Sequence, residues 1–515
     1  MSPRRPAIAF AMVLTAIAVV YAVRLDDAAG LLVDDAWYIV LATSLARGDG
    51  YVLISSSTTS ILPAVPPGFP IVLSPIVLAL PRFPDYVIWM KLVSVAAVFT
   101  AGVICWRDFT RHRGLTPAHA TLIVAATLLT PALVFLATST VMADCVFLLA
   151  QIASVVAVER ITRHGDDDVR APLAAATLTA AAVLIRSAGA ALVIAAIVFL
   201  LIAKRWRQAA IFVGAVAAGV LPWAMYAATH APTDEERVAH GGTIAYSYSR
   251  LLTAPRFEDP SQGVASKAAL VERIIGNLSV VLMRDVGAVL VPSIYRGPDE
   301  SGREVFSIGR PLMGHMGVAR GTMIVSTIVG VIMVIGWIGS ARERLALPGL
   351  LVAATLPMIA PVSGQTFRYL IPLAPYLVLF FWRGVGWPAV ARPALLIVIG
   401  LHGLEHAGYI HQKLTATPQW IADWRENVEV LGWIAQNVPA GETLAATNPG
   451  LIYLGSNRHT RAIDGMQRNW ARWKADGVRY VVSTVPRSDL PPTSLGWRLR
   501  FRSGRRALWV VEITD

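Results

Sequence analysis

The stretch AIAFAMVLTAIAVVYAVRLDDAAGLLVDDAWYIVLATSLARGDGY (residues 7–51) joins a long apolar segment to a short amphipathic one that opens on two adjacent acids, Asp34 and Asp35. A run of about 20 mostly apolar residues is enough to span a bilayer as a helix. Because the basic sequence MSPRRP precedes this run and no clear cleavage site follows it, we expect an uncleaved first helix with a cytoplasmic N-terminus. Paired negative charge just after a membrane helix is rare without a use for it, so these acids are the first candidates for chemistry.

The composition places the whole chain in the membrane class. Of its 515 residues, 55% are hydrophobic and only 15% are charged, and the mean hydropathy is +0.57. A soluble domain usually carries about 25% charged residues. The net charge of +12 does not indicate nucleic-acid binding, because the basic residues fall in short clusters between apolar runs, as in cytoplasmic loops. The two cysteines, Cys105 and Cys145, lie in or beside apolar runs, where neither a disulfide framework nor a metal site is expected.

About eleven segments are apolar enough to be predicted as membrane-spanning helices. They are residues 7–24, 86–106, 118–137, 141–159, 172–186, 188–203, 209–227, 321–339, 350–362, 370–383 and 393–406. With the N-terminus inside, this arrangement also places the basic clusters between spans inside. The Pro-interrupted segment 68–80 is predicted to be an external juxtamembrane or half-buried helix, because counting it as a span would reverse that charge pattern. The segment 277–294 is interrupted by Arg284 and Asp285, so we expect it to be interfacial or to cap a cavity.

The predicted fold is a polytopic α-helical membrane protein with a small C-terminal domain. Residues 1–406 form the membrane module, and its long loops 25–85 and 228–320 lie on the extracytoplasmic face. Residues 407–515 form an extracytoplasmic α/β domain. Its predicted elements are a Trp-rich helix (420–438), strands at 443–447, 478–484 and 507–514, and a hairpin turn at Gly504. We expect the protein in the inner (plasma) membrane.

The acids of this chain admit a structural and a functional interpretation. An acid before an apolar-periodic run can cap a helix, which explains one member of the pair Asp34-Asp35 better than both. Functionally, one carboxylate would be the general base for an acceptor hydroxyl, and the other would orient substrate or bind a cation. Asp144, at the start of the fourth predicted span, lies on the same face as Asp34 in this topology. The two could share a divalent cation, whereas the alternative for Asp144 is a cap or a buried pair with an arginine.

Two arginines stand where an unpaired charge is costly. Arg186 interrupts the long apolar stretch 172–203, and Arg368 precedes a predicted span within SGQTFRYLIPLAPY (363–376). An arginine at such a place faces a cavity or an anion, or else marks the loop between two short helices. The planar guanidinium suits phosphate oxygens because it donates two bonds at once. A lipid phosphate is therefore the expected anion.

The order of these features resembles the GT-C glycosyltransferases, in particular the family 39 type, which includes protein O-mannosyltransferases and the lipid A aminoarabinose transferase. The resemblance covers about residues 1–400 and rests on the order of weak motifs. The matching residues are Asp34-Asp35-Ala36-Trp37-Tyr38, Leu45, Gly48, Pro66-Pro67, Asp144, Arg186, Leu221-Pro222-Trp223 and Arg368-Tyr369 with Pro372 and Pro375.

The resemblance implies a sugar donor linked to a polyprenyl phosphate, handled on the outer face of the membrane. It implies that Asp34 is the base and that Asp144 helps to bind a metal. Asp35 stands where Glu is common, and its shorter side chain leaves its contact with substrate open. The predicted site is listed in full as catalytic Asp34 and Asp35, substrate-binding Arg186, Arg368, Tyr369 and Tyr38, and metal-binding Asp34 and Asp144.

The expected reaction is an inverting transfer of the sugar to a hydroxyl acceptor, which is a glycan, a lipid or a protein. A divalent cation is the expected cofactor, and membrane lipids but no nucleic acid are the expected partners. A transporter or flippase of a lipid-linked precursor would also need a cavity, intramembrane arginines and paired acids. The enzyme is favoured because no internal repeat is found and the acids gather at one face. A non-catalytic partner in cell-envelope assembly is the third alternative.

Overall fold

The computed structural model describes most of the chain. The described residues are 4–56, 61–163, 168–233, 248–255, 263–291, 294–298, 304–308, 320–340, 346–362, 366–415, 417, 419–463, 466–485, 488–504 and 507–514. The predicted loop 228–320 is described only in part, and the basic residues at 342–344 fall outside these ranges.

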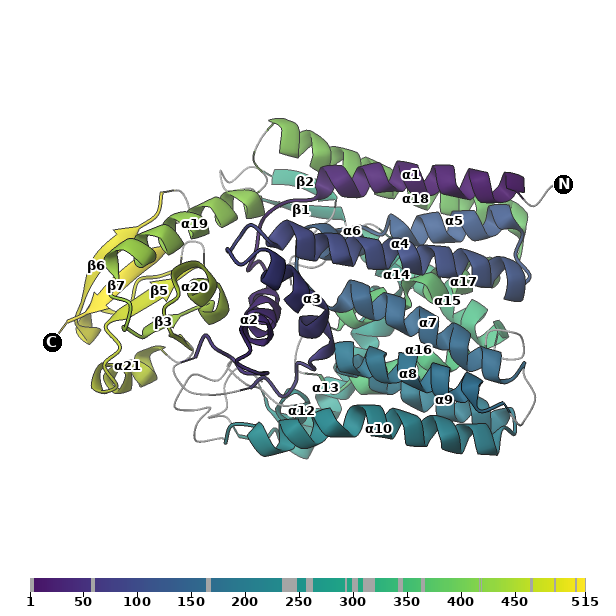
Figure 1. Cartoon of the computed structure of the whole chain (residues 1–515). Coiled ribbons are helices and arrows are strands. Elements are labelled where there is room, and N and C mark those ends of the chain that lie inside the picture. Colours follow the sequence, from purple (N-terminus) through teal and green to yellow (C-terminus); the bar gives the residue numbers. More distant parts are fainter. Residues whose placement is uncertain are drawn as a thin grey trace.

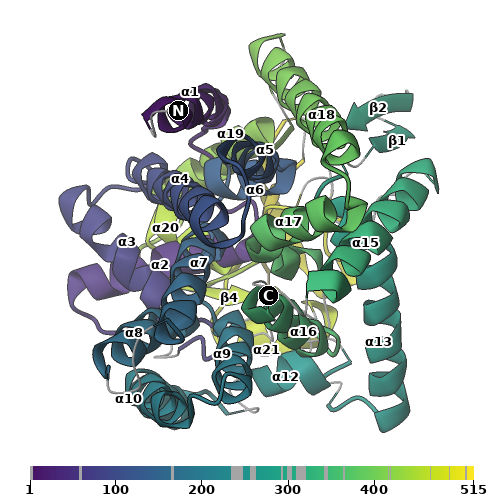
Figure 2. The same ribbon diagram turned by 90° about the vertical axis from the view of Figure 1, so that its right-hand side faces the viewer.

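A bundle of apolar helices forms the body of the molecule (Figure 1). These helices are α1 (Arg4–Arg24), α4 (Val87–His112), α5 (Pro117–Leu128), α6 (Pro131–Thr138), α7 (Asp144–Ile161), α8 (Arg170–Ile185), α9 (Ala190–Ile202), α10 (Trp206–His230), α15 (Arg320–Ser340), α16 (Ala346–Ile359), α17 (Ala374–Val385) and α18 (Pro388–Thr415). Each predicted span coincides with one of these helices or, for 118–137, with the pair α5 and α6. Seen nearly end-on, α7 lies inside the bundle between α4 and α8 (Figure 2).

Their lengths and apolar character make this a multi-pass membrane protein. Among the described residues, five helices are long and apolar enough to cross a membrane, and the pair α5 and α6, bent by 59°, would make a sixth. The helices α8, α9 and α16 are shorter apolar helices, so the count of eleven spans stays a prediction. The last predicted span, 393–406, is part of a longer helix that begins at Pro388 and ends at Thr415.

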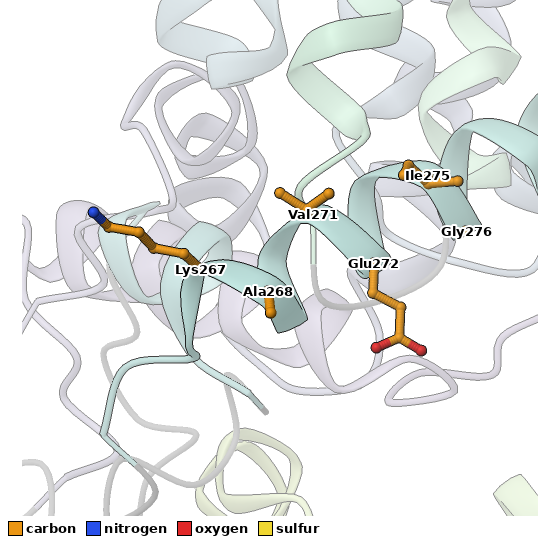
Figure 3. Close-up of a pocket in the computed structure, with 6 residues that line it drawn as sticks. All are labelled: Lys267, Ala268, Val271, Glu272, Ile275 and Gly276. Carbon is orange, nitrogen blue, oxygen red and sulfur yellow. The ribbon is translucent and has the colours of Figure 1, made fainter.

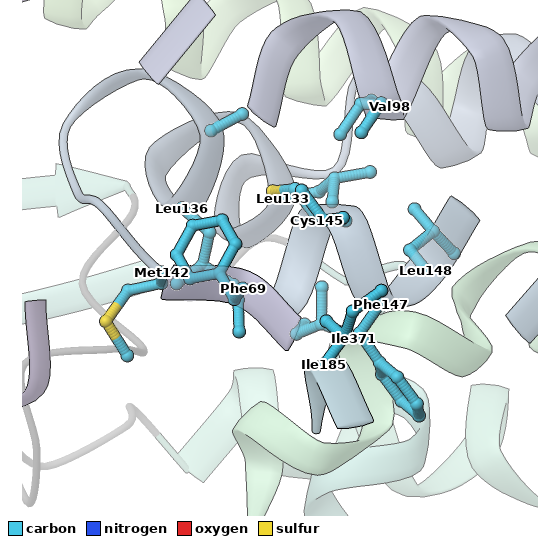
Figure 4. Packing of buried hydrophobic residues seen from close by; sticks show 14 of the residues in the cluster. Phe69, Val98, Leu133, Leu136, Met142, Cys145, Phe147, Leu148, Ile185 and Ile371 are labelled. Carbon is cyan, nitrogen blue, oxygen red and sulfur yellow. The ribbon is translucent and has the colours of Figure 1, made fainter. Parts of the chain in front are cut away.

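Close backbone approach holds parts of the bundle together. A Cβ atom on Gly336 of α15 would lie 1.9 Å from the Phe380 carbonyl oxygen of α17, and one on Gly384 would lie 1.9 Å from that of Ile332. Small residues at helix crossings permit such contact, which replaces the missing hydrophobic driving force inside a membrane. Around α7, apolar side chains from α3, α6, α8 and the segment after Thr366 pack into one core (Figure 4).

Two short helices lie between one end of the bundle and the C-terminal sheet (Figure 1). Helix α2 (Val33–Arg47) ends at Gly48, whose φ of 83° closes the helix in the left-handed conformation that glycine favours. Helix α3 (Gly68–Ala79) is the Pro-interrupted segment that we predicted to be helical outside the spans. Its first residue packs directly on the end of α8, because a Cβ on Gly68 would lie 2.6 Å from the Leu184 carbonyl oxygen.

The described part of the long loop before α15 is mainly helical. It contains α12 (Tyr248–Thr253), α13 (Lys267–Val280), a π-helical turn η3 (Val281–Asp285), α14 (Val286–Ala288) and the hairpin strands β1 (Ile294–Pro298) and β2 (Glu304–Ile308). Asn277 of α13 donates its amide to the carbonyl oxygens of Ala360 and Val362, at 2.7 and 2.9 Å. This contact ties the loop to the turn that follows α16.

The C-terminal unit is a five-stranded mixed sheet with flanking helices. Its elements are α19 (Gln419–Asn437), β3 (Leu444–Ala446), α20 (Pro449–Ser456), β4 (Thr460–Ala462), α21 (Met466–Ala475), β5 (Tyr480–Ser483), β6 (Trp497–Arg502) and β7 (Trp509–Ile513). The strand order is β4-β3-β5-β7-β6, with β3 parallel to β4 and β5, and β7 antiparallel to both of its neighbours. The three predicted strands and the hairpin around Gly504 are present, whereas β4 and α21 were not predicted.

Candidate active site

Four charged side chains from four distant segments meet at the end of the bundle that faces the C-terminal sheet. Arg368 donates from Nη1 to Asp34 Oδ2 at 3.0 Å and from Nε to Asp144 Oδ2 at 3.1 Å. Arg186 pairs with the other oxygen of Asp144. Two guanidinium groups therefore face two carboxylates, and Arg368 links the carboxylate of α2 to that of α7.

Helix α2 carries Asp34 into this cluster. Asp34 lies in the first turn of the helix, where the exposed N–H groups and the helix dipole favour a negative charge. Its side chain keeps 33% of its surface exposed, whereas the side chain of Asp144 is fully buried. Tyr38, one turn later on the same face, packs edge-on against Phe69 with ring centroids 5.0 Å apart. Burial raises the pKa of Tyr38, and the nearby Arg368 and Arg186 oppose that rise.

A break between two helices places Arg186. The chain leaves α8 at Ile185, and Arg186 adopts an extended conformation (φ −153°, ψ 127°) before the short turn η1 (Ser187–Gly189). Gly189 permits this break, because a Cβ there would lie 2.8 Å from the backbone of Val183. The Arg186 guanidinium carbon lies 4.8 Å from the centre of the Tyr369 ring, a cation–π contact.

The 3₁₀ helix η4 (Phe367–Leu373) carries Arg368 and Tyr369. Two side chains that sequence reasoning did not select fix this turn. Thr366 Oγ1 donates to Asp285 Oδ2 at 2.9 Å, and Gln151 Nε2 donates to the Pro372 carbonyl oxygen at 2.8 Å. Asp285 could have been selected from the sequence, because it is a charged residue that interrupts an apolar stretch. Nothing in the sequence distinguishes Gln151, because a single amide within a membrane helix is compatible with many roles.

Asp35 is not brought to the arginines. Its side chain is fully buried, and no side-chain donor binds either carboxylate oxygen within the described part of the chain. Burial raises the pKa of Asp35 to about 7, and the charge of Lys91 partly opposes this rise. Lys91 itself binds the Asp26 carboxylate at 2.7 Å and the carbonyl oxygens of Asp26 and Ala28. Of the predicted site residues, Asp35 is thus the one that lies apart from the cluster.

The carboxylates of Asp34 and Asp144 do not form a good metal site as they stand. Divalent cations of the Ca²⁺ and Mg²⁺ type take about six or more oxygen ligands, and Arg368 already binds both of these carboxylates. No group of three or more His, Cys, Asp or Glu side chains suited to a metal occurs among the described residues. The divalent cation stays a prediction, and no chemical step below depends on it.

An open groove along α13 is separate from this cluster (Figure 3). All of its lining residues belong to that one helix: Lys267, Ala268, Val271, Glu272, Ile275 and Gly276. None of the predicted site residues lines it. Val271 and Ile275 are exposed, which is typical of an amphipathic helix lying at a membrane surface.

Comparison with known proteins points to the glycosyltransferases. The model of glycosyltransferase family 87 matches residues 65–303, a range that contains Asp144 and Arg186. The archaeal oligosaccharyltransferase AglB from Archaeoglobus fulgidus, solved with an inhibitory peptide and a dolichol-phosphate, is similar with a TM-score of 0.50 and 12% identity. The match covers 92% of this chain and 69% of that chain.

Two further structures are similar. ArnT from Cupriavidus metallidurans, bound to undecaprenyl phosphate, gives a TM-score of 0.46 at 13% identity, covering 98% of this chain and 97% of that chain. The arabinofuranosyltransferase AftD from mycobacteria gives 0.48 at 13% identity, covering 100% of this chain and 40% of that chain. No curated protein matches the sequence.

The match to glycosyltransferase family 87 over residues 65–303 supports the predicted glycosyltransferase, and the fold is shared with AglB. The family model that matches is family 87, which is compatible with the predicted resemblance to the family 39 type.

Proposed function

We propose that this protein transfers a sugar from a polyprenyl-phosphate donor to a hydroxyl acceptor on the extracytoplasmic face of the membrane, with inversion at the anomeric carbon. The observation that carries the proposal is the convergence of Asp34, Asp144, Arg186 and Arg368 from four segments. Buried arginines at the end of a membrane bundle suit an anion that is itself anchored in the membrane.

In the proposed reaction the acceptor oxygen attacks the anomeric carbon of the donor sugar. The bond between that carbon and the phosphate oxygen breaks, and the lipid phosphate leaves with the electron pair. Asp34 takes the proton from the acceptor hydroxyl, because it is the carboxylate of the cluster that remains partly exposed. One displacement of this kind inverts the anomeric configuration.

The arginines would stabilise the charge that develops on the leaving phosphate. Groups that are already oriented in a dry site do this more effectively than water, because they need no reorganisation during the reaction. Asp144, fully buried between Arg186 and Arg368, holds both guanidinium groups in place. Tyr38 and Tyr369 flank the arginines and would contact the sugar or the phosphate.

The fold shared with AglB supports the choice of donor class, because that enzyme was solved with a lipid phosphate. We further propose eleven spans, a cytoplasmic N-terminus in the inner membrane and an extracytoplasmic C-terminal domain. The basic clusters of the sequence support this orientation. The acceptor is a glycan, a lipid or a protein hydroxyl.

The test is to incubate purified protein with a panel of polyprenyl-phosphate sugars and to detect the released lipid phosphate by mass spectrometry. We expect release with at least one donor, and Asp34→Asn should lower it about 10²- to 10⁴-fold, the usual contribution of a general base. Asp49→Asn is the matched control, because Asp49 is an exposed acid of the same loop.

Full turnover by the Asp34→Asn variant would remove Asp34 as the base. Movement of an intact lipid-linked sugar across a vesicle membrane without cleavage would instead support a transporter. Adding EDTA to the same assay tests the predicted divalent cation, because a cation-dependent enzyme loses activity and regains it with added metal.

A further inference from the structure

Helix α20 of the C-terminal unit sits directly on the helix that carries the acids. A Cβ atom on Gly450 would lie 3.2 Å from the Ala36 Cβ and 3.4 Å from Cδ1 of Trp37. Both neighbours belong to the first turn of α2, next to Asp34 and Asp35. A side chain at position 450 therefore pushes on this turn, because both partners are fully or almost fully buried.

Asn448 connects α20 to the segment that leads into α2. Its Oδ1 caps α20 by accepting from the Leu451 N–H at 3.2 Å, and its Nδ2 donates to the Gly30 carbonyl oxygen at 3.1 Å. Gly30 has a φ of +73°, and a Cβ there would lie 2.7 Å from Cδ2 of Leu451. The fit between α20 and residue 30 thus depends on glycine, both for its backbone conformation and for its space.

The same segment is fixed from the side of the bundle. Buried Lys91 of α4 binds Asp26 and the carbonyl oxygen of Ala28, and Ser139 donates to the second oxygen of Asp26 at 2.7 Å. Residues 26–30 are therefore held by the membrane helices on one side and by α20 on the other. This leaves little freedom for the start of α2.

Further contacts between the C-terminal unit and loop 25–85 lie at the end of α2 and after it. Arg47 donates to the Tyr453 hydroxyl at 3.2 Å, and the Thr460 N–H donates to the Ser55 carbonyl oxygen at 2.8 Å. The rings of Phe83 and Trp424 meet edge-on with centroids 6.0 Å apart. The unit thus contacts the described part of this loop at several points between residues 30 and 83.

We propose that α20 is a positioning element for catalysis: through Gly450 and Asn448 it sets where α2 presents Asp34 to the acceptor and to Arg368. This inference rests on the proposed function, in which Asp34 is the base. Neither Gly450 nor Asn448 contacts the substrate, so both act through α2. A displacement of about 1 Å at a reacting group can lower a rate about 10²-fold.

The first experiment replaces Gly450 by valine in the full-length protein. We expect kcat to fall about 10-fold or more, while the Kd for the lipid phosphate alone stays within about 2-fold, because Arg186 is untouched. Gly432→Val is the matched control: Gly432 is also helical, on exposed α19, and its Cβ would meet nothing within 4 Å. The control should keep both constants.

The second experiment separates the two bonds of Asn448. Aspartate and serine both cap a helix as well as asparagine does, but neither can donate an amide N–H to Gly30. Asn448→Ser should therefore lower the unfolding midpoint less than the loss of the cap would, and still lower kcat about 3- to 10-fold, a smaller displacement than the one caused by valine. Asn448→Asp should lower kcat as well, but it also loses stability, because position 448 is buried and the carboxylate would face the Gly30 carbonyl oxygen. Asn448→Ala, which also loses the cap, should lower both the unfolding midpoint and kcat.

Wild-type kcat in Gly450→Val and Asn448→Asp, together with inactive Asp34→Asn, would overturn the positioning role and leave the proposed function standing. A loss of lipid-phosphate binding equal to the loss of kcat would also overturn it, because a general collapse of the site would then explain both. Full turnover by Asp34→Asn would remove Asp34 as the base, on which the positioning role rests, and no release of lipid phosphate from any donor by the wild type would remove the proposed function itself.

Discussion

The two ends of α7 carry buried charge clusters that are built from the same groups but differ in access. Asp144 begins the helix in the active-site cluster, and Glu159 lies about 22 Å further along it in a second cluster. There, Arg113 binds Asp108 and Glu159, each at 2.8 Å, and the three side chains are at most 6% exposed. In the active-site cluster the side chain of Asp34 is 33% exposed.

The difference distinguishes a closed cluster that links helices from an open one that meets the substrate in the proposed function. Asp108 and Arg113 are close in sequence, so the second cluster joins the end of α4 to the end of α7 within the bundle. The first cluster takes Asp34 from a loop helix and Arg368 from a 3₁₀ turn, and both can respond to a ligand. A fully buried ion pair can only link the helices that carry it. In a partly exposed cluster, a charged side chain can release the side chain that it binds and bind a substrate group instead.

Among the variants that test the difference between the two clusters, Arg368→Gln should have the largest effect on activity. It removes the group that bridges Asp34 and Asp144, and we expect transfer to fall about 10²- to 10³-fold, as for other oriented donors to a developing anion. The measurement is kcat with the donor found in the panel. Equal losses of activity in Arg368→Gln and in Arg113→Gln would show that the two clusters do not differ in role.

Arg113→Gln should act on stability instead. Removing one partner of a buried ion pair costs about 3–5 kcal/mol, because Asp108 loses the cation that it binds and Glu159 keeps only the partly exposed Arg163. We expect a lower unfolding midpoint in detergent but nearly unchanged turnover per folded molecule. A variant as stable as the wild type would mean that water or another donor replaces the guanidinium.

The sequence predicts the helices and part of the candidate site, because these leave a local pattern of apolar and charged residues. Long apolar runs located the helices, and the cost of charge in such runs selected Asp144, Arg186 and Arg368. The same reasoning does not identify Arg113, which follows a predicted span among other basic residues and yet has a side chain only 1% exposed. A buried partner at distant Glu159 cannot be inferred from local composition.

The acid pair shows a second limit. Adjacent helical residues point about 100° apart, so Asp34 and Asp35 cannot both face the same arginines. The sequence gives no indication of which one turns inward, because that is decided by where α2 packs. The contacts of Asn448 with Gly30 and of Gly450 with α2 link residues some 400 positions apart, and no pattern in one sequence predicts such a pairing.

Asp35, which belongs to neither cluster, should make the stability of the protein depend on pH. The pKa of Asp35 is raised from 3.8 to about 7 in the folded protein, so the folded state binds the proton more tightly than the unfolded chain. Stability from this group is therefore fully present below about pH 4 and is lost as pH rises to about 7. The loss is at most about 4 kcal/mol, at about 1.4 kcal/mol per pKa unit.

Asp35→Asn cannot ionise, so its unfolding midpoint should lack this decline. We expect the two proteins to be similar near pH 4 and the variant to be the more stable one at pH 8, measured by thermal unfolding between these values. Parallel curves for variant and wild type would mean that Asp35 is ionised in the folded protein and has an unseen donor.

The smallest expected effect concerns the rim of the second cluster. Arg163 reaches Glu159 at 3.4 Å, one turn away on the chain, and its side chain is 39% exposed. Exposed pairs at this spacing contribute about 0.3–0.5 kcal/mol, because water screens them and the long side chain loses freedom. Arg163→Ala should therefore leave turnover unchanged and barely shift the unfolding midpoint. If Arg163→Ala instead lowered the free energy of unfolding nearly as much as Arg113→Gln does, the exposed arginine would stabilise the second cluster as much as the buried one. Side-chain exposure would then no longer distinguish the two clusters at the ends of α7.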